Sequence, residues 1–384
     1  MPDLPLSGLT VVDFSTLLPG PLASLMLCEA GADVIKVEPP GGENMRRSKP
    51  SWGPDSAIFA LLNGGKKCIA LDLKNDKHRN GLLPLIERAD VLIEQFRPGV
   101  MERLKLDYAT LSRINPRLIY CSITGYGQTG ALSQRAGHDL NYLSETGLLA
   151  LNPGPRGDPQ LPPLLAADIA GGAYPAVINI LLALAQRERT GRGQHLDVAM
   201  ADSMFPFAFW ALPNGWLGHG WPERGSNVFS GGSPRYQLYE TSDGALLAVG
   251  ALEDKFWEAF CKTIELPEEF RERGCKPHAA IQAVREIIAS RPGSHWQKVF
   301  AGEDCCCGLV RSLQEATASP HFKDRGLFDY ALSDAAGNRM PALPVPIVSE
   351  LRKAISEERR PPAQGQHNDE LLGAGLAGSD ESSA

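Results

Sequence analysis

The sequence predicts an α/β protein with a doubly wound parallel sheet in its larger part and a second, smaller α+β domain. Three observations predict this class. Short apolar segments alternate with helical segments over residues 1–200, which is the pattern of successive strand–helix–strand units. After about residue 200 the sequence becomes rich in aromatic residues and glycine, with no clear period. The length of 384 residues suits two or three domains of roughly 150 residues each.

The first predicted unit is a strand, a helix and a strand. Residues 9–14 (LTVVDF) form a buried strand, and residues 17–22 (LLPGPL) form a tight loop. Pro21 is expected at the first position of the next helix, where its missing N–H has no structural cost. That helix covers residues 23–30, and residues 33–38 (DVIKVE) form the second strand. The unit therefore has the shape of a Rossmann-like fold.

This unit is not expected to bind a dinucleotide. Glu38 follows the loop at the distance of an acidic ribose ligand, about 20 residues. The loop, however, reads P-G-P instead of G-x-G-x-x-G, and its prolines remove N–H groups that would hold a pyrophosphate. We therefore predict a Rossmann-like shape without the nucleotide fingerprint.

Three more strand segments extend the pattern. Residues 68–73 (CIALDL) form one strand, and residues 91–94 (VLIE) form another after the helical segment 78–88. Residues 118–124 (LIYCSIT) form the next. This alternation over roughly 1–200 predicts a doubly wound domain.

The smaller domain is predicted from a hairpin followed by helices. Residues 236–239 and 246–249 are expected to pair as antiparallel strands around the turn S-D-G. Helical segments follow at residues 255–263, 279–290 and 294–301. We predict a large Rossmann-like domain, a linker, a small α+β domain, and a linker with a C-terminal segment, at residues 1–200, 201–224, 225–325 and 326–384.

Composition excludes several classes of protein. The net charge of −7 argues against a general nucleic-acid binder, which needs a basic surface. The apolar run 170–185 is shorter than the roughly 20 residues of a membrane span, and the N-terminal residues lack the pattern of a secretory signal. The eight cysteines match no zinc or disulfide framework. We expect reduced thiols in a cytoplasmic protein with no membrane partner.

Three short segments carry residues suited to chemistry. His138 stands in GHDLNY, Asp168 stands in LLAADIAGG before an apolar helix, and Glu253 ends VGALE after an apolar strand. Each residue alone has a plainer interpretation. His138 would be structural, Asp168 would cap the helix, and Glu253 would be a solvated loop charge. The sequence by itself does not show whether the three meet in space.

The sequence resembles the class III CoA-transferase (CaiB/BaiF) family, and within it is most similar to the α-methylacyl-CoA racemases. The resemblance rests on segments such as PGPLASLMLCEAGADVIKVE, ADVLIEQFRPGVMERLKL and RTGRGQHLDVAM, and covers roughly residues 4–330. The GHDLNY and GALE segments are the specific ones, because they separate racemases from transferases. The resemblance implies an interlocked homodimer in which the C-terminal segment returns to the large domain.

The resemblance also implies roles for individual residues. His138 and Asp168 match the catalytic pair, and Glu253 matches the carboxylate that partners the histidine. Ten further residues match the family segments that line the CoA and acyl-thioester site. They are Leu71, Asp72, Leu73, Lys74, Arg97, Gly137, Asp139, Leu140, Asn141 and Tyr142.

One position departs from the racemase pattern. Pro39 stands where many racemases have an arginine that contacts the CoA nucleotide. Arg46 or Arg47 is a candidate to supply the missing charge. Further cations for the CoA phosphates are Lys66, Lys67, Lys74, Arg97 and Arg103, each of which could equally be an ordinary surface charge.

These residue types suit the epimerisation of a 2-methylacyl-CoA. That reaction needs one group to take the C2 proton and another to return one from the opposite face. His138 has a suitable pKa, and Asp168 is expected to be protonated because residues 164–167 are apolar. We expect Glu253 to orient the imidazole, and backbone N–H groups at the start of the 168–172 helix to hold the enolate oxygen. No metal or redox cofactor is needed.

Two alternatives stay open. A CoA-transferase would use Asp168 as a nucleophile that forms a mixed anhydride with the acyl group. A non-catalytic acyl-CoA-binding protein would turn over no ester. The acyl group itself is not predicted, and the aromatic stretch 205–216 is interpreted as core more readily than as a pocket wall.

Overall fold

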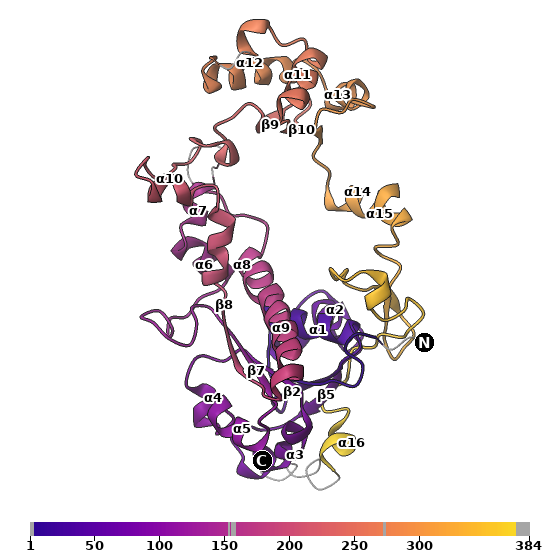
Figure 1. Cartoon of the computed structure of the whole chain (residues 1–384). Coiled ribbons are helices and arrows are strands. Elements are labelled where there is room, and N and C mark those ends of the chain that lie inside the picture. The colour runs from indigo at the N-terminus through magenta and orange to yellow at the C-terminus, as the bar shows by residue number, and fades with distance from the viewer. Residues whose placement is uncertain (1–3, 153, 155–158, 272–273, 374–384) are drawn as a thin grey trace. The chain divides into compact units, whose positions relative to one another are not determined.

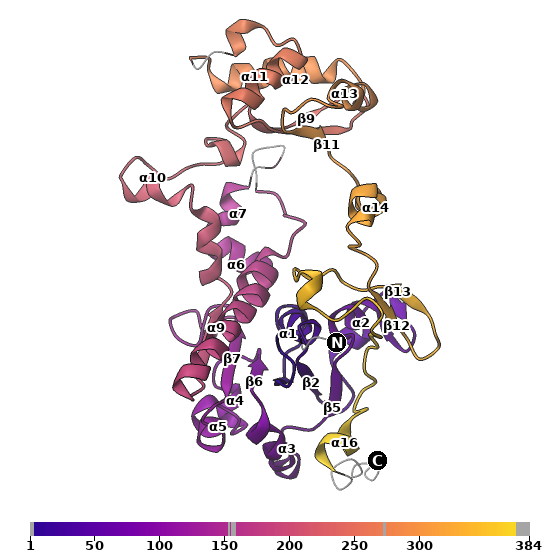
Figure 2. The same cartoon turned by 45° about the vertical axis from the view of Figure 1, so that its right-hand side comes forward.

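The computed structural model describes residues 4–152, 154, 159–271 and 274–373. Their contacts divide the chain into two compact units. The first unit comprises residues 1–146, 164–206 and 321–384, and the second comprises residues 147–163 and 207–320. Residues 147–163, predicted in the large domain, therefore belong to the second unit. The C-terminal segment belongs to the first, whose elements are seen in Figures 1 and 2.

The first unit is built on a six-stranded parallel sheet. The order of its strands is β5-β2-β1-β6-β7-β8. Each crossover between neighbouring parallel strands carries helices, as a doubly wound sheet requires. In chain order the strands are β1 (Thr10–Asp13), β2 (Asp33–Glu38), β5 (Lys67–Ala70), β6 (Val91–Glu94), β7 (Ile119–Thr124) and β8 (His195–Ala199).

The sheet is covered on both faces, and the two-residue period of β1 shows how. Val12 and the following Phe14 belong to a core that α3 (Asp76–Arg88) and α5 (Tyr108–Ile114) complete. Asp13 points to the opposite face, where Ser24 of α1 donates to it. The long helix α9 (Tyr174–Thr190) packs against α1 (Pro19–Glu29), β7 and β8 on this face (Figure 1).

Several predicted boundaries shift in the structure. Strands β2 and β6 have the predicted bounds, but β5 ends at Ala70, three residues early. Helix α1 starts at Pro19, so Pro19 and not Pro21 occupies its first position. Strand β8 was not predicted, because only its last two residues are buried and its apolar pattern is therefore short.

The C-terminal segment is tied to the first unit by buried charges. Glu29 at the end of α1 is paired with Arg352 (2.8 Å) and Arg359 (2.6 Å), and both guanidinium groups lie over the ring of Tyr330. Helix α16 (Asn368–Leu372) packs on β5 and α3. The C-terminal segment also contains the strands β12 (Ala331–Ser333) and β13 (Arg339–Pro341), which form an antiparallel pair.

The second unit holds a small antiparallel sheet of order β11-β10-β9. Strands β9 (Tyr236–Glu240) and β10 (Leu246–Gly250) form the predicted hairpin, and β11 (Cys307–Leu309) pairs with β10. Buried side chains of the sheet and three helices form its core. These helices are α11 (Asp254–Thr263), α12 (Pro277–Ala289) and α13 (Gly293–Val299).

Shorter elements complete the described chain. They are η1 (Asn44–Arg47), β3 (Ser51–Trp52), β4 (Asp55–Ser56), α2 (Ala57–Asn63), α4 (Val100–Arg103), α6 (Asp139–Glu145), α7 (Leu148–Leu151), α8 (Ala166–Asp168), η2 (Ile169–Ala173), η3 (Asp202–Ala208), α10 (Leu212–Trp216), η4 (Val228–Ser230), η5 (Glu268–Phe270), α14 (Leu313–Ala318), α15 (Pro320–Asp324) and η6 (Ser349–Leu351).

Two expectations about apolar segments are corrected. The aromatic stretch 205–216 is not core, because Phe209 and Trp216 are 69% and 72% exposed. The apolar run 170–185 lies within a longer continuous helical stretch, Ala166–Thr190. By length and composition alone that stretch is able to span a membrane, which is weak evidence because core helices of soluble proteins share these properties.

Candidate active site

His138 occupies the N-cap position of α6, with extended backbone. Its backbone N–H donates to the Asn141 side-chain oxygen (3.0 Å), and its carbonyl accepts from the Asn141 N–H (2.8 Å). These two bonds fix the entry into the helix. Tyr142 adds a third, because its hydroxyl donates to the carbonyl of Gly137 at 2.6 Å. The G-H-D-L-N-Y sequence therefore builds a rigid turn that presents the imidazole.

Asp168 lies at the end of α8 and does not cap it, so the helix-cap interpretation is wrong. The start of α8 is capped by Asp139, whose Oδ1 accepts hydrogen bonds from the N–H groups of Ala167 (2.6 Å) and Asp168 (3.0 Å). Asp139 is itself only 5% exposed. The aspartate that follows the histidine thus anchors the segment that carries the second predicted catalytic residue. This leaves the Asp168 carboxyl free for another role.

The same contact corrects the predicted position of the enolate oxygen. The N–H groups of Ala167 and Asp168 are occupied by Asp139, and that of Ile169 donates to Leu165. They are therefore not open to a substrate. Among the described residues, the N–H groups of Asp139 and Leu140 at the start of α6 have no hydrogen-bond acceptor. Helix starts normally leave such donors over.

The backbone after Asp168 needs glycine for close packing. A Cβ on Gly171 would lie 2.6 Å from the Met200 carbonyl oxygen, and one on Gly172 would lie 2.9 Å from Pro19. Both glycines belong to the π-helical turn η2, which connects α8 to α9. Any side chain there would push the turn away from β8 and α1. The two glycines in LLAADIAGG therefore allow the turn that follows Asp168 to pack closely against Met200 and Pro19.

One cavity of about 400 Å³ is lined by six of the twelve predicted site residues of the first unit. His138 and Asp168 both line it, together with Arg97, Gly137, Asn141 and Tyr142. The rest of the wall comes from Thr16, Leu17, Pro19, Gln95, Phe96, Pro98, Ile123, Thr124, Gly125, Ser133, Arg135, Ala136 and Met200.

Burial sets the protonation of the carboxyl group in this cavity. Burial raises the pKa of Asp168 to about 6, and the nearby charge of Asp139 adds to the rise, while His138 opposes it. Burial also raises the pKa of Tyr142 to about 12, so that its hydroxyl stays neutral and keeps its bond to Gly137. Asp168 thus exchanges a proton in the range where a general acid or base works.

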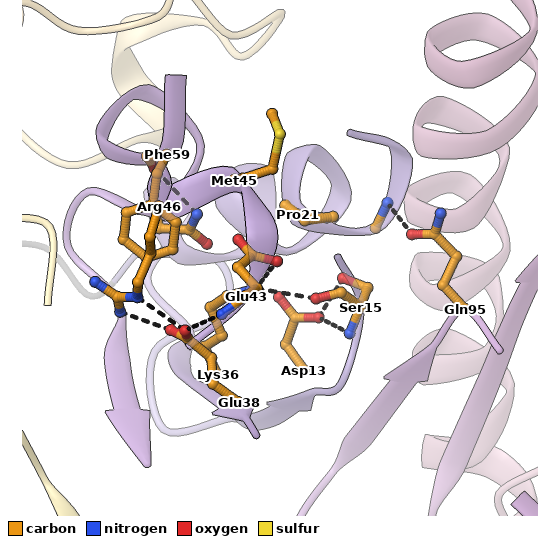
Figure 3. A network of polar contacts seen from close by, with 12 residues as sticks. Asp13, Ser15, Pro21, Lys36, Glu38, Glu43, Met45, Arg46, Phe59 and Gln95 are labelled. Atoms are coloured by element: carbon orange, nitrogen blue, oxygen red, sulfur yellow. Dashed lines mark hydrogen bonds and ion pairs between the residues drawn. The ribbon is translucent and has the colours of Figure 1, made fainter. Parts of the chain in front are cut away.

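The loop between β1 and α1 forms another wall of the cavity, and two buried lysines bond to the backbone of this loop and of the first turn of α1. Figure 3 shows one of them, Lys36. Lys36 Nζ donates to the carbonyl of Ser15 (2.9 Å), and Lys66 Nζ donates to that of Pro21 (2.9 Å). Between them, the N–H of Gly20 donates to the Gln95 side chain at 3.1 Å. The loop and the first turn of α1 are therefore fixed.

A buried carboxylate balances these lysines. Asp13 accepts from the hydroxyls of Ser15 and Ser24 and lies 3.4 Å from Lys66 Nζ. Burial acts to raise the pKa of Asp13, but Lys66, Lys36 and the two serines hold it below its usual value. Burial lowers the pKa of Lys66 to about 8 against the pull of Asp13. Lys66 is therefore a structural charge, and the expectation that it binds CoA phosphate is wrong.

The remaining predicted contacts lie outside this cavity. Leu71 is a core residue, and Asp72 accepts the backbone N–H of Lys74 at 2.9 Å. Lys74 and Leu140 are exposed, and Leu73 packs against the core. None of these five lines the cavity that holds His138.

The structure also distinguishes the two candidates, Arg46 and Arg47, for the positive charge that is missing at Pro39. Arg46 is buried and bonded to Glu38 (2.6 Å) and Asp55 (3.0 Å), so it does not offer its charge to a ligand. Arg47 is exposed and bonds only to Gly41 and Asn44 within the described chain. Of the two candidates, Arg47 is the one with a solvent-facing charge.

Glu253 belongs to the second unit. It precedes α11 at the N-cap position, is exposed, and makes no capping bond with its side chain. Its predicted pairing with His138 stays a prediction. Nothing in the single sequence indicated the roles of Asp139, Lys36 and Asp13, because each depends on contacts with residues distant along the chain.

Comparison with known proteins finds CoA-transferases and acyl-CoA racemases among the relatives of this chain. The family model described as CoA-transferase family III matches residues 6–368. The chain is 35% identical to mouse alpha-methylacyl-CoA racemase, with 96% of this chain and 92% of the relative covered. It is 34% identical to acetyl-CoA:oxalate CoA-transferase of Acetobacter aceti, with 90% of each covered. A crystal structure of a CAIB/BAIF family protein from Brucella suis matches with a TM-score of 0.81 and 30% identity, over 96% of this chain and 98% of that one.

Proposed function

The chain belongs to CoA-transferase family III, and on that premise we propose that it epimerises C2 of 2-methylacyl-CoA thioesters by proton transfer through an enolate. The observation that carries the proposal is that His138 and Asp168 line one cavity. Burial there raises the pKa of the Asp168 carboxyl to about 6. A racemase needs two such proton carriers on one carbon.

In the proposed reaction the pair carries one proton between its two members. The deprotonated member takes the proton from C2, and the protonated member delivers one from the other face. An Asp168 pKa near 6 keeps both protonation states accessible at neutral pH, which an ordinary aspartate would not do.

The remaining parts of the proposal follow the racemase relatives. Glu253 would orient the imidazole of His138, and Arg97 and Arg47 would supply charge for CoA. The reaction uses the thioester as substrate and calls for no metal or redox cofactor. Eight free cysteines suit a reducing compartment such as the cytoplasm.

A homodimer is also part of the proposal. An apolar cavity of about 490 Å³ lies between α1, α9 and residues 346–351 of the first unit. Beside it Ile178, Leu182 and Val348 are 56%, 64% and 61% exposed. Apolar surface of this kind on a described face suits coverage by a second copy of the chain.

The alternative function is transfer of CoA between carboxylic acids through an acyl anhydride of Asp168. It is favoured by relatives such as human succinyl-CoA:glutarate CoA-transferase, which is 31% identical over 96% of this chain and 85% of that one. For transfer, the Asp168 carboxylate attacks the thioester and the histidine has no necessary part. The two reactions therefore differ in what the loss of His138 does.

Deuterium uptake at C2 separates the two functions. The protein is incubated in D₂O with (R)-2-methylacyl-CoA and no acceptor acid. Uptake with formation of both epimers supports the racemase. Folded protein that binds the ester without uptake contradicts it for that substrate, and a screen of carboxylate acceptors then tests transfer. In a transferase, His138→Ala keeps much of the activity and Asp168→Ala abolishes it.

A further inference from the structure

Three consecutive cysteines in the second unit form a compact cluster of thiols. Cys305 is buried in the core at 1% exposure, Cys306 is exposed, and Cys307 is half-buried at the start of β11. The sulfur atoms of Cys305 and Cys307 lie only 3.3 Å apart. All three are free thiols. The first and third are therefore close enough to react with one another.

The backbone conformation of the middle residue brings the two sulfurs together. In a regular strand, residues two apart share a face but lie roughly 6.6 Å apart along the chain. Cys306 has φ = +50°, in the left-handed region that residues with a side chain seldom adopt. This bends the chain between its neighbours, so that the side chains of Cys305 and Cys307 converge.

The same bend contacts the segment that leads to Glu253. Cys307 pairs with Val249 in the sheet, and the carbonyl of Cys306 accepts the N–H of Gly250 at 2.9 Å. Gly250 is the last residue of β10, and Glu253 follows three residues later at the start of α11. A change in the peptide of Cys306 therefore acts directly on the anchor of this segment.

We propose that Cys305 and Cys307 are a reversible modification site, a dithiol that a low-molecular-weight disulfide oxidises to an intramolecular disulfide. The thiolate of Cys307, the more accessible of the two, attacks the oxidant RSSR, forms a mixed disulfide and releases one RS⁻. The thiolate of Cys305 then attacks the Cys307 sulfur and releases the second RS⁻. Two protons from the protein thiols convert both leaving groups to RSH, so the two protein sulfurs are oxidised and RSSR is reduced.

The rate of this exchange should rise with pH. Burial raises the pKa of both the Cys305 and the Cys307 thiol. The neighbouring titratable groups Glu303, Asp304 and Cys306 add no positive charge to oppose that rise. The thiolate, not the thiol, is the reacting species, so the thiolate fraction limits the exchange at neutral pH. We expect roughly tenfold faster oxidation per pH unit between pH 7 and 9.

The test is mass spectrometry of the full-length protein after treatment with glutathione disulfide. After acid quenching and alkylation, trypsin releases all three cysteines in one peptide, residues 299–311. The expected product has lost two hydrogens and carries one alkyl group, on Cys306. Reduction with dithiothreitol should restore three alkylated thiols. A disulfide that includes Cys306, or three alkylated thiols after treatment, would overturn the proposal.

Matched variants test the assignment. Cys306→Ser should still form the disulfide, and Cys307→Ser should not. Cys305→Ala repeats the second result at the buried position, in case one substitution impairs folding, which circular dichroism monitors. Loss of the product in Cys306→Ser alone would contradict the assignment.

Hydrogen exchange of residues 246–255 tests the effect on the Glu253 segment without any substrate. Oxidation should speed exchange of this peptide several-fold in the wild type and leave Cys307→Ser unchanged. An unchanged peptide in the oxidised protein would refute the coupling. Oxidation should also lower the rate of C2 deuterium exchange several-fold, and dithiothreitol should restore that rate. That last readout rests on the proposed function, whereas the mass and hydrogen-exchange results do not.

Discussion

Asp13 and Asp168 belong to the same unit but have opposite electrostatic environments. Asp13 is fully buried, yet its pKa is lowered, because two lysines and two hydroxyls surround it. Asp168 is only partly buried, yet its pKa is raised to about 6, because burial and then the charge of Asp139 raise it, and His138 alone opposes them. The depth of a carboxyl group in the protein therefore does not decide its charge. The partners that share its burial decide it.

The difference separates a structural charge from a reactive one. The Asp13 cluster fixes the loop after β1 and the first turn of α1, both of which contribute to the cavity wall. Asp168 projects into that cavity with its backbone N–H bonded to Asp139 and its carboxyl free to titrate. The four predictions that follow begin with the largest expected effect.

Removing either of the two proposed proton carriers should have the largest effect, on turnover. Asp168→Asn and His138→Ala are each expected to lower the kcat of C2 deuterium exchange by about 10³-fold, because general acid–base groups contribute roughly 10²–10⁴. The exposed residues Asp202 and His219 give matched controls, Asp202→Asn and His219→Ala, which should keep near wild-type rates. Exchange that survives His138→Ala would remove the pairing on which the comparison depends.

Removing the charge of Asp13 should instead lower stability. Asp13→Asn leaves Lys66 buried without its counter-charge, and we expect a loss of about 3–5 kcal/mol in the free energy of unfolding. Urea denaturation measures it. Asp33→Asn, at an exposed ion pair with Lys67, is the control and should cost less than about 1 kcal/mol. Equal losses in the two variants would show that the Asp13 cluster is not a structural charge network.

The pH dependence of stability should have opposite signs at the two sites. The Asp168 pKa is higher in the folded state than in the unfolded state, so its contribution falls as pH rises from about 4 to about 6. The Asp13 pKa is lowered, so its contribution is lost only as pH falls below about 4. Asp168→Asn should therefore be more stable than wild type at pH 7, by about 1 kcal/mol after allowance for partial exposure. At pH 4 the two should unfold at the same urea concentration, and a constant difference would contradict this account.

Glu43 provides the smallest and most specific test. It is buried like Asp13, at 3% exposure against 0%, but neither carboxylate oxygen has a hydrogen-bond partner among the described residues, and Lys36 Nζ lies 3.3 Å from one of them. Burial raises its pKa. Because ionised Glu43 is disfavoured in the folded state, Glu43→Gln should leave stability at pH 7 unchanged or raise it by up to about 1 kcal/mol. A loss comparable to that of Asp13→Asn would show that depth, and not partners, governs this cluster.

The sequence predicted those features that local patterns determine. Strand β6 begins with the continuous apolar run 91–93, and β2 has Val34, Ile35 and Val37 around Lys36, and the bounds of both strands were predicted without error. Strand β8 has one face towards solvent and a charged residue in its middle, Asp197, so its pattern was too weak. The plainer interpretation of Asp168 as a helix cap followed local spacing, but the side chain that caps the start of this helix is Asp139, 29 residues before Asp168. The burial of Lys66 likewise depends on Asp13, which lies 53 residues before it.

The pairing of Glu29 with Arg352 and Arg359 has a consequence for how the chain is made. The two arginines follow their partner by 323 and 330 residues. At roughly 10 residues per second, a ribosome would release them about half a minute after Glu29. During that time the end of α1 has no arginine to neutralise Glu29, so this edge of the first unit cannot close. The second unit is complete once residue 320 emerges. Nascent chains should therefore acquire protease resistance first in the middle of the sequence and last at its two ends.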